Sequence, residues 1–129
     1  MSMDPEDAVA DWAARVERQS ALTTDLSKRL QQARASAESR GGEVVVTVDN
    51  SGGLADLRLS ERAMRLSPRD LGEIILATSR RAQAKLAQQV ADVVASLYGE
   101  GSETAAFIGK TYSEQFPEPD DEAEERDQR

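Results

Sequence analysis

The chain has 129 residues, a net charge of −8 and 4% aromatic residues, and it contains neither cysteine nor histidine. These totals predict one domain with at most an appendage, and they exclude disulfides, thiolate and histidine chemistry and zinc fingers. The low aromatic content argues against base-stacking platforms. The charge is uneven, because residues 99–129 carry 10 acidic and 3 basic side chains while residues 1–98 carry 14 and 13. The acidic total therefore says little about what the first 98 residues bind.

The first predicted element is a long helix from residue 5 to about residue 37. Asp4 can cap it, Pro5 suits its first position, and no glycine or further proline interrupts it. At about 1.5 Å per residue the helix would extend roughly 50 Å, more than a small core can cover. We therefore expect its N-terminal half to project outward or to pair with another chain. Trp12, the only tryptophan, fits an interface anchor and a core contact equally well. An imperfect heptad pattern comprises Val9, Val16, Thr23 and Leu30 in one series and Trp12, Gln19, Leu26 and Ala33 in the other.

A β-hairpin is predicted for residues 41–59. Residues 44–48 (VVVTV) are mostly β-branched, residues 49–53 (DNSGG) are turn formers, and residues 54–59 (LADLRL) alternate apolar and polar side chains. Residues 35–40 (ASAESR) fit two interpretations, the end of the first helix or a third, short strand. Because two strands alone are marginal in water, the hairpin must pack on helices, on further strands or on a second copy of itself.

A second long helix is predicted to begin after Ser67 and to end near Tyr98, with Gly99 as its stop. Ser67 can cap it, Pro68 fits its first position, and apolar residues follow at spacings of three and four for about seven turns. Residues 60–66 are expected to form a linker or a single helical turn. One hairpin cannot cover this much apolar surface, so we predict a homodimer.

The C-terminal residues divide into two parts. Residues 99–116 are predicted to form a flexible segment or a short helix. Residues 117–129 are charged and contain proline but almost no apolar side chain, so we expect a disordered acidic tail.

No motif in the sequence predicts catalysis. The glycine pairs at 41–42 and 52–53 lack the spacing and the lysine of a phosphate-binding loop, and the nucleophile-elbow and HExxH patterns are missing. No apolar run approaches the roughly 18 residues of a membrane span, and the N-terminus lacks a signal-peptide pattern. We therefore predict a cytoplasmic protein that is not an enzyme and has no metal, cofactor, small-molecule substrate or membrane contact.

Basic side chains are the remaining candidates for a binding surface. Arg81 and Lys85 are four residues apart and share a helix face, with Arg80 one step round. The alternative interpretation is a solvated surface, because acidic neighbours balance these charges and a strong DNA-binding domain usually has a basic excess. The other basic residues considered are Arg15, Arg18, Lys28, Arg29 and Arg34 in the first helical segment, and Arg58, Arg62, Arg65 and Arg69 further on.

The order of the predicted parts matches a known pattern. A long charged helix leads into G-x-V-x-V-T-V, a turn rich in Gly and Asn, L-x-x-L-x-L, and then S-P-x-D-L and a helix beginning L-x-x-I-I-x-A. Over roughly residues 8–97 this combination resembles the YbaB/EbfC family of bacterial nucleoid-associated proteins. The matching residues are Gly42, Val44, Val46, Thr47, Val48, Leu54, Leu57, Leu59, Pro68, Leu71, Ile74, Ile75, Ala77 and Ala82.

The resemblance implies an α+β fold in which residues 1–98 form one dimerisation and DNA-binding domain. In the implied homodimer, paired sheets form the central body and helices project as arms that bind duplex DNA with low sequence specificity in the nucleoid. The family contacts DNA through basic residues on its helices, and the corresponding candidates here are Arg15, Arg18, Lys28, Arg29, Arg80, Arg81 and Lys85. The dimer interface is expected at Val44, Val46, Val48, Leu57, Leu59, Ile74 and Ile75.

Two hypotheses on function stay open at this point. The first is a dimeric, nucleoid-associated DNA-binding protein, and in that case residues 118–127 are hypothesised to compete with DNA for the basic side chains. The second is a protein-interaction adaptor or chaperone-like dimer on the same scaffold that has lost DNA binding. The second hypothesis is motivated by the near-neutral charge of residues 1–98, the acidic tail and the heptad pattern of the first helix.

Overall fold

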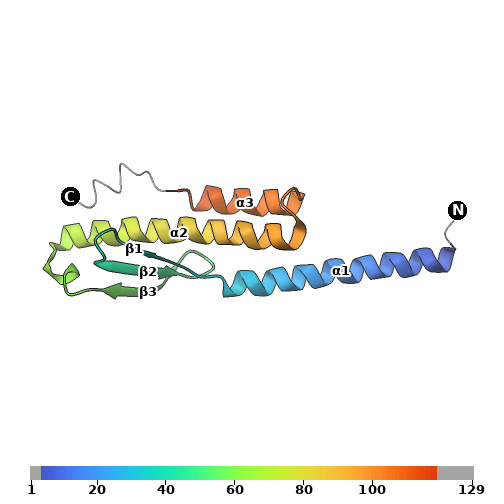
Figure 1. The fold of residues 1–129 in the computed structure, drawn as a ribbon, viewed down its shortest axis with the longest axis horizontal. Helices are drawn as coiled ribbons and strands as arrows, with labels where there is room; N and C mark the ends of the chain where they lie inside the picture. The colour runs from blue at the N-terminus through green and yellow to red at the C-terminus, as the bar shows by residue number, and fades with distance from the viewer. Residues whose placement is uncertain (1–3, 119–129) are drawn as a thin grey trace.

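The computed structural model describes residues 4–118 as a long helix, a three-stranded antiparallel sheet and two further helices (Figure 1). This order confirms the predicted α+β fold class. The sheet order is β1-β2-β3, so the hairpin has a third strand in front of it. The elements are α1 (Pro5–Gln32), β1 (Ala35–Glu38), β2 (Val44–Val48), β3 (Leu54–Leu59), a 3₁₀ turn η1 (Ala63–Arg65), α2 (Pro68–Tyr98) and α3 (Glu103–Gln115).

The first helix ends about five residues earlier than predicted, because residues 35–38 form β1. Ala35 and Ala37 are buried on one face of this strand, while Ser36 and Glu38 are exposed on the other. The Ser36 and Thr47 hydroxyl oxygens lie 2.6 Å apart across β1 and β2. The predicted cap at the other end of α1 is wrong in one detail, since the Asp4 side chain makes no capping hydrogen bond.

The core lies between the sheet and α2. Val44, Val46 and Val48 alternate toward α2 and are at most 1% exposed, and Leu86 on α2 is fully buried against this face. The helix begins as predicted, with the Ser67 hydroxyl accepting a hydrogen bond from the Asp70 amide at 3.1 Å. The chain therefore buries much of the β2 valine face by itself.

Strand β3 lies at one edge of the sheet, and all six of its residues are exposed. Leu57 pairs with Val46 and Leu59 with Val44, so both leucines lie on the same face of the sheet as the valines that α2 covers. They remain 37% and 40% exposed because α2 packs mainly over β1 and β2. The register shifts between Thr47 and Val48, a β-bulge that simple alternation did not predict.

The N-terminal half of α1 projects away from the rest of the structure (Figure 1). Leu26 and Leu30 pack into the core, and the Thr23 and Tyr98 hydroxyl oxygens lie 3.5 Å apart where α1 passes the end of α2. Towards the N-terminus the helix is exposed, and Trp12 is 62% exposed. The prediction that this half projects is therefore confirmed, and Trp12 is not a core contact within the chain.

Helix α3 folds back along α2, so residues 99–116 contain the short helix that was one of the two predictions (Figure 1). Gly99 ends α2 with φ of 92°, and Ser102 caps α3 through the Ala105 amide at 3.0 Å. The predicted tail lies mostly outside the described residues, since the structure describes nothing beyond residue 118.

The end of α3 contacts the β2–β3 turn. Phe116 is buried there, and a Cβ atom on Gly52 would overlap its ring. Gly52 also has φ of 83°, a value that favours glycine. Asp49 holds the turn by accepting hydrogen bonds from the amides of Ser51 and Gly53, at 2.9 and 3.0 Å. The β2–β3 turn therefore places Gly52, which has no side chain, where the Phe116 ring packs.

Candidate nucleic-acid interface

The seven candidate DNA-contacting residues lie in three places. Two are on the projecting half of α1, two are in the last turns of α1, and three are near the middle of α2. Six of them are exposed and Arg81 is half-buried. In the order of these three places they are Arg15 and Arg18, then Lys28 and Arg29, then Arg80, Arg81 and Lys85.

Arg81 and Lys85 both bind the backbone of the edge strand β1. Arg81 Nη1 donates to the Glu38 carbonyl oxygen at 2.7 Å, and Lys85 Nζ donates to the Ser36 carbonyl oxygen at 3.3 Å. The Ser39 amide donates to the Val44 carbonyl oxygen at 2.8 Å, so the backbone of Ser39 faces β2. The backbone groups of successive strand residues alternate between the two edges, so the Ser36 and Glu38 carbonyls point away from β2. The two basic side chains therefore cover a strand edge that would otherwise offer free acceptors to another chain.

Removing these two side chains is expected to weaken the fold. Arg81→Ala and Lys85→Ala should each lower the free energy of unfolding by about 1 kcal/mol, since each removes a hydrogen bond to the β1 backbone at a partly exposed site. Amide exchange in residues 35–38 should become faster. Urea unfolding and hydrogen exchange measure these effects, and Arg80→Ala on the same helix serves as the control. Equal losses in all three variants would contradict this assignment.

Arg80 and Lys28 are cleaner candidates for contacts with phosphate. Arg80 is exposed, and as the neighbour of Arg81 in sequence it lies on a different side of α2 from the face whose Arg81 and Lys85 contact β1. Lys28 is exposed in the penultimate turn of α1, and the neighbouring Arg29 forms an ion pair with Asp25 at 3.4 Å. Among the described residues, neither Arg80 nor Lys28 makes an ion pair or a side-chain hydrogen bond.

The projecting half of α1 is acidic rather than basic. Residues 4–21 carry five acidic side chains and two basic ones, and Arg15 is paired with Asp11 at 3.5 Å. A net negative segment repels the DNA backbone and works against contacts by Arg15 and Arg18. The distribution of charge thus favours the C-terminal turns of α1 over its projecting half as a surface for DNA.

Several of the other exposed basic side chains have acidic partners. Arg58 pairs with Asp56 at 3.1 Å and Arg69 with Glu73 at 3.4 Å. Exposed ion pairs of this kind contribute little to stability. A DNA phosphate can replace the carboxylate in such a pair at small cost, so these pairs do not exclude a role in binding.

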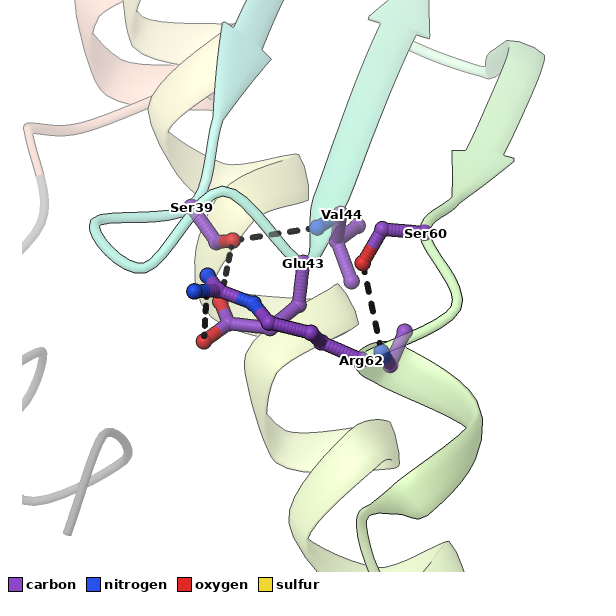
Figure 2. A network of polar contacts seen from close by, with 6 residues as sticks. Ser39, Glu43, Val44, Ser60 and Arg62 are labelled. Carbon is purple, nitrogen blue, oxygen red and sulfur yellow. Dashed lines mark hydrogen bonds and ion pairs between the residues drawn. The ribbon is translucent and has the colours of Figure 1, made fainter.

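Arg62 belongs to a polar network that joins the β1–β2 turn to the linker after β3 (Figure 2). Ser39 Oγ donates to Glu43 Oε2 at 2.8 Å and accepts from the Val44 amide at 3.1 Å, while Arg62 Nη2 lies 3.8 Å from Glu43 Oε1. The Ser60 amide donates to the Glu43 carbonyl at 2.9 Å. The Ser39 hydroxyl lowers the pKa of Glu43 below its usual value, helped by the residue's own amide and by Arg62.

Glu43→Gln is expected to destabilise the protein more near neutral pH than in acid. Because the pKa of Glu43 is lowered in the folded state, its contribution is complete above the unfolded value of 4.5 and is lost as pH falls through the folded value. Urea unfolding at about pH 7 and about pH 3 measures this difference. Ser39→Ala, which removes the largest cause of the lowered pKa, should lose most of this pH-dependent part. An equal loss for Glu43→Gln at both pH values would contradict the prediction.

The candidate dimer-interface residues fall into two groups. Val44, Val46, Val48 and Ile74 are buried within the single chain, where they form its core. Leu57 and Leu59 are exposed and Ile75 is half-buried, so these three have surface to offer to a second copy. Their role in an interface stays a prediction. The exposed large apolar residues outside this predicted set are Val9, Trp12 and Val16 on α1, Leu54 on β3, Met64 in η1, Leu76 on α2 and Phe107 on α3.

Residues 4–118 were also compared with the requirements of a membrane span and of a metal site. That part of the chain has no helix with the length and apolar character needed to cross a membrane. It also has no group of three or more acidic side chains arranged to hold a metal ion.

Comparison with known proteins gave one match. The model of the YbaB/EbfC DNA-binding family matches residues 7–101. No curated protein and no solved structure matches the chain. The matched residues include the sheet, α1 from its first turn, and α2, while α3 begins beyond them.

Proposed function

The chain belongs to the YbaB/EbfC DNA-binding family, and we propose that it acts in the bacterial nucleoid as a dimer that binds duplex DNA with low sequence specificity. The match over residues 7–101 is the observation that carries this proposal, since it includes every strand and both long helices. Membership in a DNA-binding family also agrees with the expectation of a protein that is not an enzyme.

Phosphate contacts are the proposed source of affinity. The candidate side chains are Arg and Lys on the outer surfaces of helices, where they can reach a DNA backbone but have no fixed geometry for reading bases. Lys28 and Arg80 are the leading candidates, because both are exposed and their charges are not committed to the fold. Arg81 and Lys85 are proposed to add positive charge while they hold β1.

A contact through β3 is the proposed basis of the dimer. This strand is at the sheet edge, and its outward backbone groups and the side chains of Leu57 and Leu59 are exposed. An exposed apolar edge strand is a ready template for pairing with another strand. Antiparallel pairing of β3 with β3 of a second copy would join two sheets into one central body.

A salt-series DNA titration tests the proposed function. The protein is first measured in solution for its mass, and binding to a long duplex is then followed from about 50 to 200 mM salt. If the protein binds through phosphates, the logarithm of the affinity should fall linearly with the logarithm of the salt concentration. The slope should be about −0.9 for each phosphate neutralised. The affinity should change little between duplexes of unrelated sequence.

The adaptor hypothesis has one specific observation in its favour. The projecting half of α1 is acidic and exposes apolar side chains, a combination better suited to a protein partner than to DNA. A purified dimer that does not bind DNA at about 50 mM salt, where electrostatic binding is strong, would favour this second function over the first.

A further inference from the structure

The projecting half of α1 carries an apolar face that nothing in the described chain covers. Val9, Trp12 and Val16 are 65%, 62% and 45% exposed. Their spacing of three and four residues places them on one side of the helix. Three large apolar side chains on one face, in a helix that reaches beyond the rest of the fold, indicate a surface that a protein partner covers (Figure 1).

This face continues a surface that is already used for packing. The heptad positions of Val9, Trp12 and Val16 are repeated by Leu26 and Leu30, and those two leucines pack into the core. Beyond the contact of Thr23 with Tyr98, α2 ends, the chain returns as α3, and α1 continues alone. The same side of α1 therefore packs on α2 near the C-terminal end of α1 and is left uncovered near the N-terminal end of α1.

The charges on this segment select the direction of a partner helix. Residues 4–11 contain four acidic and no basic side chains, whereas residues 17–24 contain one of each. Parallel pairing of two copies would place both acidic segments side by side. Antiparallel pairing places each acidic segment beside the neutral one, and it also opposes the two helix dipoles.

We propose that the projecting halves of α1 from two copies of the chain pair in antiparallel orientation through the face formed by Val9, Trp12 and Val16. In the heptad pattern this alignment stacks Trp12 of each copy on Val16 of the other, and Val9 on Gln19. Ala13 flanks this face and lets the two helices approach closely. The contact depends neither on DNA nor on β3, and where β3 also pairs it links one dimer to the next.

The mass of the protein in solution tests the contact. Trp12→Glu combined with Val16→Glu should lower the average mass, to that of one chain where β3 does not pair and to that of the β3 dimer where it does, because the α1 contact comes apart. Circular dichroism should stay that of the wild type. Phe107→Glu is the matched control, since it also places a glutamate at an exposed aromatic position, on α3. An equal mass for the wild type and the double variant across the concentration range would overturn the proposal and leave this face to a different protein.

Engineered disulfides test the direction, since the chain has no cysteine of its own. Val9→Cys and Gln19→Cys proteins are oxidised separately and as a mixture. Antiparallel pairing predicts a disulfide between the two variants in the mixture and almost none in either protein alone, because the two copies of residue 9 would lie about 15 Å apart along the helices. Disulfides within each single variant, or none in the mixture, would overturn the proposed arrangement. Since neither experiment contains DNA, its failure leaves the salt-series result on DNA binding untouched.

Discussion

Replacing Lys28 and Arg80 with Gln is expected to give the largest loss of DNA affinity of any pair of exposed substitutions. If each side chain contacts one phosphate, a dimer loses four contacts, and the log–log salt slope should become shallower by about 3.6. Near 0.1 M salt, the affinity should fall by up to about three orders of magnitude. A salt-series titration on a long duplex measures both quantities.

Lys110→Glu is the matched control for this double variant. It changes the net charge by the same two units per chain, but it lies on α3, beyond the residues that match the DNA-binding family. A general effect of charge would lower the affinity equally in both proteins. If Lys110→Glu reduces the slope as much as the double variant does, Lys28 and Arg80 are not specific phosphate contacts.

Leu86→Ala is expected to give the largest loss of stability of a single substitution on α2. The Leu86 side chain is fully buried in the core cluster that includes Val44, Val46 and Val90, so the substitution leaves a cavity. Removing a buried leucine side chain costs about 2–5 kcal/mol, a large part of the 5–15 kcal/mol that stabilises a typical domain. Urea unfolding at fixed protein concentration measures the loss, because a dimer's apparent stability depends on concentration.

Leu76→Ala provides the same substitution at an exposed site of the same helix. Its side chain is 57% exposed in the single chain, so the loss should stay within about 0.5 kcal/mol. A larger loss that depends on protein concentration would place Leu76 in the contact between copies. Equal losses at positions 76 and 86, independent of concentration, would contradict the described packing of α2.

The parts of the fold that could be predicted from sequence are those with strong local signals. Residues 44–48 are β-branched and are followed by turn formers, which gave the hairpin. Ser67 and Pro68 gave the start of α2 to the residue. The sequence does not decide between helix and strand for β1, because residues 35–38 are Ala, Ser, Ala and Glu, which have no strong strand preference. Its conformation depends on pairing with β2 and on packing under α2.

The same limit applies to the candidate interface. Helical spacing predicted correctly that Arg81 and Lys85 share a face. It did not predict that this face lies on the backbone of β1, since that requires knowing that residues 36 and 38 form a strand edge. Likewise, the alternation in β2 predicted an apolar face, but only the packing of α2 shows that this face is covered within the chain.

The contact between Phe116 and Gly52 also bears on the order in which the chain assembles. These two residues are far apart in sequence, and the ends of long loops meet only at a cost in entropy. Contacts between residues closer in sequence, such as those of the hairpin, cost less entropy to form, so we expect α3 to dock late in folding. The small side chains of Ala84, Ala87 and Ala91 line the gap between α2 and the end of α3. A chain in which α3 has not yet docked therefore exposes this alanine surface.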